Sequence, residues 1–275
     1  MTGYYQRVAE YFDQDAPDFD ARYWGNPVLQ RIRQAFREEV KRHPFTTVLE
    51  LGCGTGLDLC HFGNIYPGCR FFGMDVSPAM VRLARAKVNG SRLSNVEVAQ
   101  GSVEQIEERF PGQHFDLVYV FFGALNTVES LRGAADLLYR VTAPGGVLVL
   151  SVVNRLYVAD ILIDLFRGRW RHAWRRLGPV WGGYSPARRL ETRCYGPRHV
   201  ATAFEREGSL VRRRGFSIVY PAWYRAHWLR RLRGLGRYLW ELDTLVSRTP
   251  LWSCGEYAFY VYRYERGTPA SRAAP

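Results

Sequence analysis

The sequence lacks several features that would assign it to other protein classes. It has no apolar run near the ~18 residues of a membrane span, and its first twenty residues carry acids where a signal peptide has a basic start and an apolar segment. Five cysteines are scattered without a CxxC pair, which favours reduced thiols in a cytoplasm over a disulfide framework or a zinc site. No glycine loop ends in Gly-Lys-Ser/Thr, so a triphosphate site is not expected.

Lysine is nearly absent, since only Lys41 and Lys87 occur, yet the net charge is +12. The excess belongs to one part of the chain: residues 1–45 have net charge 0, 46–153 have −2 and 154–275 have +14. Segments 155–177 and 221–240 interleave tryptophan with arginine. Such segments suit an anionic membrane surface, RNA or the solvated rim of a pocket, and all three interpretations stay open at this point.

Short apolar runs alternate with helical patterns between residues 46 and 153. The expected strands are 46–51, 70–75, 96–100, 115–122 and 146–153, followed by 210–220 and 257–264. The expected helices lie near 56–66, 78–89, 103–110 and 129–142, with another near 197–207. Strands that alternate with helices in this way predict an α/β fold with a doubly wound parallel sheet.

The same pattern predicts the domain organisation. Residues 1–45 are expected to form an N-terminal helical lid, 46–153 a cofactor-binding core and 154–196 a helical cap insertion. Residues 197–265 should supply the remaining core helix and strands, with a Trp/Arg-rich insertion at 221–255. Residues 266–275 are expected to form a tail.

A glycine loop follows the first expected strand. Gly52, Gly54 and Gly56 alternate in "LELGCGTG", a spacing that differs from the GxGxxG dinucleotide fingerprint. Asp75 ends the second expected strand, where an acid can accept hydrogen bonds from both ribose hydroxyls and repels a 2′-phosphate. The alternative for Asp75 is a cap on the next helix, although Ser77 already stands at the N-cap position.

Five motifs in order resemble the class I S-adenosylmethionine-dependent methyltransferases of the small-molecule and natural-product type. They are "VLELGCGTG" (48–56), "GMDVSPAM" (73–80), "QGSVEQI" (100–106), "FDLVYVFFGALNTV" (115–128) and "APGGVLVLSV" (143–152). The resemblance implies a Rossmann-like sheet of seven strands with the last one antiparallel, helical cap insertions, and S-adenosyl-L-methionine as cofactor. No metal is expected.

The resemblance also implies a set of cofactor-binding residues. In it the glycine loop passes under the methionine part, Glu50 helps to hold the amino group and Asp75 holds the ribose. The full set is Glu50, Gly52, Cys53, Gly54, Gly56, Asp75, Val76, Met80, Ser102, Val103, Phe121 and Phe122. Ser102 departs from the family, which usually has an Asp there for the adenine amino group, so we expect a weaker adenine contact shared with the Val103 backbone.

The residues expected at the methyl acceptor are fewer. Asn126 either orients an acceptor or caps the helix that starts near Glu129. Tyr11 or Tyr5 either stacks over the sulfonium or packs within an amphipathic helix. The candidate general bases are His172, Tyr184 and Tyr195, which lie in or beside the first insertion. None of them is assigned as the base.

These observations predict methyl transfer by direct displacement to an oxygen, nitrogen or carbon atom of a small or lipophilic metabolite. The product would belong to the biosynthesis of a secondary metabolite, a quinone or a lipid. The alternatives are an RNA methyltransferase and a non-catalytic S-adenosylmethionine-binding protein. The expected location is the cytoplasm, with peripheral contact to an anionic membrane as a further interpretation of the basic half.

Overall fold

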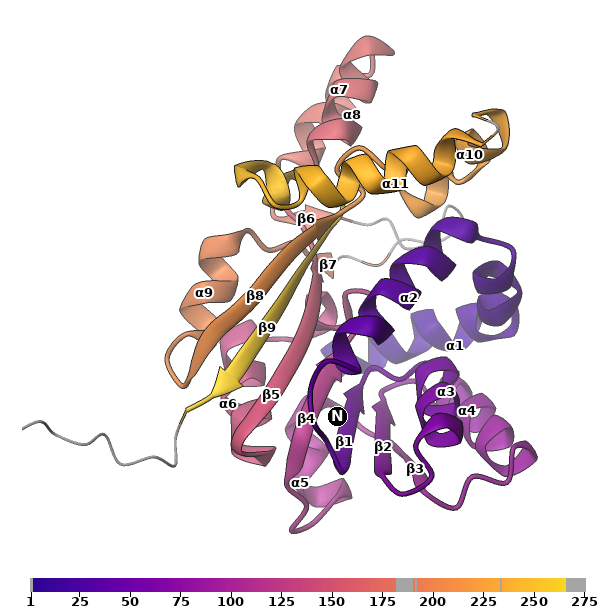
Figure 1. The fold of residues 1–275 in the computed structure, drawn as a ribbon, viewed down its shortest axis with the longest axis vertical. Coiled ribbons are helices and arrows are strands. Elements are labelled where there is room, and N and C mark those ends of the chain that lie inside the picture. Colours follow the sequence, from indigo (N-terminus) through magenta and orange to yellow (C-terminus); the bar gives the residue numbers. More distant parts are fainter. Residues whose placement is uncertain (1, 182–189, 191, 233, 266–275) are drawn as a thin grey trace, which may run out of the picture.

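A seven-stranded sheet crosses the centre of the protein in this computed structural model, which describes residues 2–181, 190, 192–232 and 234–265 (Figure 1). The strand order is β3-β2-β1-β4-β5-β9-β8. The strands are β1 (Thr47–Leu51), β2 (Arg70–Asp75), β3 (Val96–Gln100), β4 (Phe115–Val120), β5 (Thr142–Val153), β8 (Gly208–Phe216) and β9 (Tyr257–Tyr264). The first five pair in parallel, whereas β9 is antiparallel to both β5 and β8. The predicted Rossmann-like sheet with an antiparallel last strand is confirmed.

Helices cover both faces of the sheet. One face packs against α2 (Pro27–Val40), α3 (Leu57–Ile65) and α4 (Pro78–Gly90). The other packs against α5 (Ile106–Arg109), α6 (Leu131–Val141) and α9 (Pro197–Phe204). Strands covered on both faces need nearly continuous apolar sequences, which explains runs such as "LVYV" in β4. Each face therefore has its own apolar core.

Several element boundaries differ from expectation, and two of the strand ends have backbone reasons. β4 stops at Val120, two residues early, because Phe122 and Gly123 both take left-handed backbone conformations with φ of +51° and +77°. β8 stops at Phe216 because Ser217 has φ of +58°. The expected helix at 103–110 is a 3₁₀ turn, η1 (Val103–Gln105), followed by the single turn of α5.

The remaining elements surround the sheet edge that carries the carboxyl ends of β1 and β2. Helix α1 (Gly3–Trp24) packs against α4 and α2. The other elements are η2 (Ala124–Thr127), α7 (Val158–Phe166), α8 (Trp170–Arg176), β6 (Val180–Trp181), β7 (Thr192–Arg193), η3 (Trp223–Arg225), α10 (His227–Arg231), α11 (Leu235–Val246) and η4 (Pro250–Cys254). Part of the expected cap, 182–189 and 191, and the expected tail lie outside the described residues.

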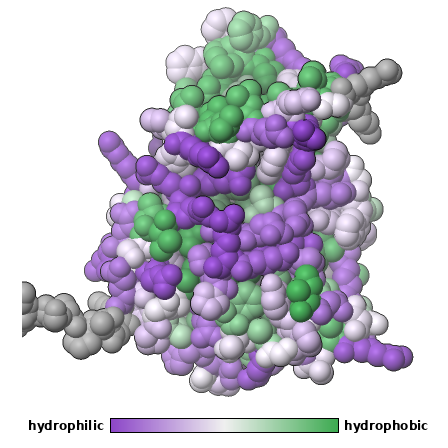
Figure 2. Space-filling view, viewed as in Figure 1, coloured by the Kyte–Doolittle hydropathy of each residue, from purple (hydrophilic) through white to green (hydrophobic). Residues whose placement is uncertain are grey.

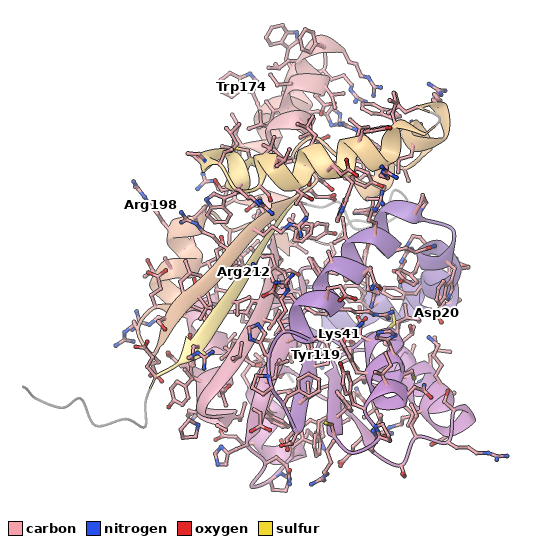
Figure 3. The ribbon with its side chains drawn as sticks, in the orientation of Figure 1. Asp20, Lys41, Tyr119, Trp174, Arg198 and Arg212 are labelled. Atoms are coloured by element: carbon pink, nitrogen blue, oxygen red, sulfur yellow. The ribbon has the colours of Figure 1, made fainter. Side chains whose placement is uncertain are left out.

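Helices α7, α8 and α11 form one end of the molecule (Figure 1). Apolar side chains gather over the end formed by α7 and α8 (Figure 2), and Trp174 projects from α8 there (Figure 3). Within the described part of the chain, no helix combines the length and the apolar composition needed to span a bilayer.

Candidate functional site

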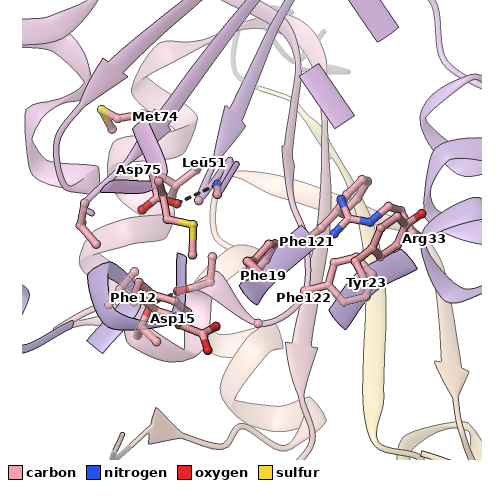
Figure 4. Close-up of a pocket in the computed structure, with 18 of the residues that line it drawn as sticks. Phe12, Asp15, Phe19, Tyr23, Arg33, Leu51, Met74, Asp75, Phe121 and Phe122 are labelled. Atoms are coloured by element: carbon pink, nitrogen blue, oxygen red, sulfur yellow. Dashed lines mark hydrogen bonds between the residues drawn. The ribbon is translucent and has the colours of Figure 1, made fainter. Parts of the chain in front are cut away.

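A cavity of about 160 Å³ lies at the carboxyl ends of β1, β2 and β4 (Figure 4). Its floor is formed by the glycine loop and strand ends, including Leu51, Gly52, Gly54, Met74, Asp75 and Val76. Six residues of α1 cover it: Tyr5, Phe12, Asp15, Phe19, Arg22 and Tyr23. In open α/β sheets, ligands bind outside the carboxyl ends of the strands, so the cavity is where the fold places a ligand.

The three loop glycines serve different purposes. All have positive φ, +74° at Gly52, +53° at Gly54 and +78° at Gly56, a conformation that disfavours side chains. A Cβ on Gly52 would lie 2.5 Å from the Cβ of Ala124, and one on Gly56 would lie 3.0 Å from the Cβ of Ala84. A Cβ on Gly54 would meet only the Phe19 ring, at 3.7 Å. Gly52 and Gly56 therefore allow close packing of the loop, whereas Gly54 keeps its backbone open toward the cavity.

Asp75 is buried beside this loop. Its Oδ2 accepts a hydrogen bond from the Gly54 N–H at 2.8 Å, and its Oδ1 accepts one from the Ser77 N–H at 2.9 Å. Burial raises the pKa of Asp75 to about 6, partly offset by the two backbone donors. Ser77 caps α4 by accepting from the Met80 N–H at 3.0 Å, so Asp75 is not needed as the cap.

The other predicted cofactor residues divide into two groups. Val76, Met80, Val103, Phe121 and Phe122 line the cavity. Cys53, Gly56, Ser102 and Glu50 lie behind its wall. Ser102 is the N-cap of η1 and forms a capping box with Gln105, so its hydroxyl is used by the backbone while its neighbours Gly101 and Val103 face the cavity.

Glu50 has an internal partner instead of a place on the cavity wall. Its carboxyl group accepts a hydrogen bond from the Tyr119 hydroxyl at 2.9 Å, within the sheet (Figure 3). Complete burial raises the pKa of Glu50 well above its usual range, and nearby Asp58 adds to the effect. The neutral acid is thus favoured, and the expected contact with an amino group stays a prediction.

Asn126 does not face the cavity, which corrects both expectations for it. Its side-chain amide donates to the carbonyls of Val153 and Arg193 at 3.2 and 2.6 Å, and its oxygen accepts from the Val153 N–H at 2.8 Å. With these groups engaged, the fully buried side chain joins η2 to β5 and β7 and leaves no donor for an acceptor molecule. Nor does Asn126 cap the following helix, because Ser130 caps it.

Tyr11 is also displaced from its expected position. It is buried with Val8 and Leu190 and is not among the described residues that line the cavity, whereas Tyr5, the alternative, lines the cavity and donates to Glu104 at 2.8 Å. Tyr5, Phe12 and Phe19 recur every seven residues, so they share one face of α1 over the cavity.

The side chains considered as bases do not gather at the cavity either. His172 is exposed on α8, and burial raises the pKa of Tyr195 to about 12. Tyr184 lies outside the described residues. Among the described residues of the cavity wall none is a histidine, so no general base is assigned.

The far end of the cavity is aromatic, and of its residues the predicted site set contained only Phe122. Tyr23, Phe122, Trp223 and Tyr257 line it together with Arg33. The Arg33 guanidinium lies 4.6 Å from the ring centroids of both Tyr23 and Phe122. A sequence signal existed for Arg33, since it falls on the apolar stripe of α2, four residues after Leu29. Trp223 lies in the Trp/Arg-rich segment 221–240, for which the rim of a pocket was one of three interpretations.

Arg33 belongs to a buried charged trio. It forms an ion pair with Asp58, and Arg37 Nε contacts the other oxygen of the same carboxylate at 2.6 Å. Two guanidinium groups thus share one carboxylate, which leaves one net positive charge in the trio. Arg33 brings this charge to the lining of the aromatic end, whereas Arg37 and Asp58 are not lining residues.

Polar contacts fasten α1 over the cavity. Asp20 accepts a hydrogen bond from the Thr55 hydroxyl at 2.5 Å and pairs with Lys87 of α4. Asp13 accepts from the Ser77 hydroxyl at 2.6 Å and from the Ala79 N–H at 2.9 Å. The helix is therefore held to the loop and to α4 by side chains that can separate without disrupting the core.

Comparison with known proteins agrees with this fold and site. A family model described as a methyltransferase domain matches residues 48–146. A demethylmenaquinone methyltransferase of Deinococcus radiodurans is 30% identical over 222 residues, which cover 79% of this chain and 88% of that protein. An uncharacterised protein of Methanocaldococcus jannaschii is 27% identical over 218 residues, 78% of this chain and 77% of the relative.

Solved structures show the same fold. The cyclase SpnF superposes with a TM-score of 0.63 at 16% identity, covering 95% of this chain and 97% of its own. A putative methyltransferase in complex with the Trm112 activator of Haloferax volcanii has a TM-score of 0.56 at 15% identity, with 94% and 97% covered.

The sheet, the glycine loop and the acid after the second strand define a class I methyltransferase. Together with the methyltransferase relatives, they show that the chain belongs to the S-adenosylmethionine-dependent methyltransferases and is an enzyme of that kind.

Proposed function

We propose that the cavity binds S-adenosylmethionine at its glycine end and a small, lipophilic, aromatic acceptor at its aromatic end. The observation that carries this proposal is that Asp75 and Gly54 line the same cavity as Phe122, Tyr23 and Trp223. A donor site and an apolar acceptor site thus adjoin within one partly open cavity, as methyl transfer by direct displacement requires.

The residues at the glycine end fit the cofactor. Asp75 is a buried carboxylate that can accept from two ribose hydroxyls, and the open backbone at Gly54 leaves room that a Cβ would occupy. Phe12 and Phe19 present rings over the cavity, which suits a sulfonium cation. When bound, the cofactor supplies an electrophilic methyl group. The protein's part is to hold Asp75 and the loop in place and to exclude water with α1.

The aromatic end fits a planar acceptor with acidic oxygen atoms. Rings from Tyr23, Phe122, Trp223 and Tyr257 offer stacking surfaces, and the net positive trio of Arg33, Arg37 and Asp58 favours an oxyanion nearby. A phenol or hydroquinone would lose its proton more easily beside this charge, which reduces the need for a general base. We therefore place a phenolic or quinol-type ring at this end.

Two further observations support this substrate class and its setting. The Deinococcus radiodurans relative is named for demethylmenaquinone, a quinone, and all five cysteines are free thiols, as expected in the cytoplasm. We propose that the enzyme takes part in the biosynthesis of a quinone or related secondary metabolite and meets its acceptor at an anionic membrane surface.

A labelled methyl-transfer assay tests the proposal. The enzyme is incubated with methyl-labelled cofactor and, separately, a short-chain demethylated naphthoquinol, a hydrophilic catechol or total RNA. We expect label in the naphthoquinol product with the parent and with Asp18→Asn, an exposed control on α1, and none with Asp75→Asn. Label found only in RNA, or cofactor binding by calorimetry without product from any of the three, would overturn the proposal.

A further inference from the structure

Helix α7 has its polar and apolar faces reversed relative to a helix packed on a core. Asp160 and Asp164, one turn apart, are buried. Leu162 and Phe166, also one turn apart, point outward, and Phe166 is 90% exposed. An amphipathic helix in water normally buries its apolar stripe and exposes its charges, so this arrangement requires an explanation.

Ion pairs hold the helix in this orientation. Asp160 pairs with Arg225 of η3, and Asp164 accepts from Arg169 at 2.5 Å. Rotation of α7 to bury Leu162 and Phe166 would separate buried charges from their partners, which is costly. The outward apolar face is therefore specified by the fold.

Two neighbouring helices repeat this feature. Trp170 and Trp174, one turn apart on α8, are 61% and 70% exposed. On α11, Asp243 is fully buried and accepts hydrogen bonds from three backbone N–H groups of residues 218–220. The exposed large apolar residues of α11 share one face: Leu235, Tyr238, Leu242 and Leu245.

The exposed apolar surface has a basic border. Arg167 and Arg171 are exposed around the hairpin of α7 and α8, and residues 154–181 contain six arginines and two aspartates, a net charge of +4. Figure 2 shows the apolar groups collected at this end of the molecule, and Figure 3 shows Trp174 directed away from the body.

We propose that the α7–α8 hairpin is a membrane-docking tip that inserts Phe166, Trp170 and Trp174 into the interfacial layer of a bilayer with anionic headgroups. Exposed Trp and Phe bordered by arginine are the composition that binds such an interface. Charge favours this occupant over a second copy of the chain, since two copies facing each other would oppose positive surfaces.

The tip is also connected to the acceptor end of the cavity. Trp223 lines the cavity, and Arg225, two residues further on in the same 3₁₀ turn, pairs with Asp160 of α7. This inference extends the membrane part of the proposed function and does not depend on which acceptor is methylated.

Co-sedimentation with vesicles tests the inference. The full chain is mixed with vesicles of equal parts phosphatidylcholine and phosphatidylglycerol, and with phosphatidylcholine alone. We expect stronger binding to the anionic vesicles, weakened by salt. We expect the triple variant Phe166→Ser/Trp170→Ser/Trp174→Ser to bind the anionic vesicles at least about tenfold more weakly than the parent does. The double variant Arg167→Glu/Arg171→Glu should show a loss of the same size. Trp24→Ser is the matched control, because Trp24 is 63% exposed on α1, and should bind as the parent does.

Quenching by brominated acyl chains supplies a second readout that folding alone does not change. Tryptophan emission of the parent and of Trp24→Ser should be quenched, and that of Trp170→Ser/Trp174→Ser should not. Equal vesicle binding by all variants overturns the inference. It is also overturned if the parent binds no vesicles but forms a dimer in sedimentation equilibrium, and the triple substitution abolishes that dimer. Transfer to the short-chain naphthoquinol reports on the proposed function separately, since this acceptor needs no vesicle.

Discussion

The carboxylate of Asp75 accepts a hydrogen bond from the backbone N–H of Gly54 across 2.8 Å. This contact joins the end of β2 to the glycine loop after β1, which are 21 residues apart. It sets the loop backbone and the buried acid in one position before any ligand arrives, so binding does not need to order them.

The pKa of Asp75 makes cofactor affinity dependent on pH. Burial raises it from an ordinary 3.8 to about 6, and the ionised form is the better acceptor for ribose hydroxyls. Affinity should therefore fall about fourfold between about pH 7.5 and about pH 5.5. Calorimetric titration measures this, and Asp75→Asn should bind weakly with a flat profile over the same range.

The raised pKa of Asp75 lowers cofactor affinity as the pH falls, but it increases the stability of the unliganded protein over the same direction of change. Because the folded pKa lies above the unfolded one, the native state takes up a proton first, and this contribution grows as pH falls from about 6 to about 4. This contribution is measured as the difference in the free energy of unfolding in urea between the parent and Asp75→Asn. A difference that stays constant across this range would contradict the assignment.

Gly52→Ala should destabilise the protein by about 1–3 kcal/mol and weaken cofactor binding. The new Cβ would lie 2.5 Å from the Cβ of Ala124, and φ of +74° strains any side chain. Gly68→Ala is the control, because nothing lies within 4 Å of its added Cβ. Adding Ala124→Gly removes the clash but not the backbone strain, so it should recover only part of the loss.

Phe36→Ala should lower the free energy of unfolding by about 3–5 kcal/mol. The ring is fully buried on α2, with the centroids of Phe121, Phe122, Phe216 and Phe259 between 5.0 and 5.2 Å away. Phe166→Ala removes a ring that is 90% exposed and should change stability by less than about 0.5 kcal/mol. Chemical denaturation compares the two.

Asp20→Ala should loosen α1 without unfolding the core. It removes the contacts to Thr55 and Lys87, so amide exchange in α1 should speed up and cofactor dissociation should accelerate several-fold, while the melting temperature stays within a few degrees. Asp18→Ala, two residues away and exposed, is the matched control. Equal behaviour of the two variants would show that α1 is not held by these contacts.

Arg33→Met should reduce kcat/KM for a phenolic acceptor by about 10–100-fold, the range of a lost hydrogen bond or contact to a charged group. Cofactor affinity should change less, and the pH at half-maximal rate should rise, because the acceptor then ionises without a nearby cation. Arg31→Met is the control, since Arg31 stacks on Trp240 at 5.3 Å on the outer side of α2. A fall in rate with an unchanged pH profile would indicate a structural role alone.

Local spacing was enough to predict the sheet and the glycine end of the cavity. Gly52, Gly54 and Gly56 follow one strand, and Asp75 ends the next, so their placement depends only on parallel strands ending at one edge. The prediction that Asn126 contacts the acceptor was wrong because local spacing does not show which distant groups use a side chain. Its type and position were right for a substrate contact, but two partners distant in sequence, Val153 and Arg193, already use its amide.

The set of residues at the aromatic end of the cavity could not be predicted from local spacing. Arg33, Trp223 and Tyr257 come from three separate segments, and no spacing within one segment brings them together. Likewise, periodicity shows that α7 is amphipathic but not which face is inward. That choice depends on Arg225, 65 residues from Asp160.

The sequence by itself determined the fold and the class of methyltransferase, because these follow from hydrophobic period and from glycine and acid positions within one short stretch. Only the tertiary structure decided which aromatic rings gather at the far end of the cavity and which way α7 presents its leucine and phenylalanine. Those outcomes depend on buried ion pairs and packing between distant segments, which become definite only when the chain is folded.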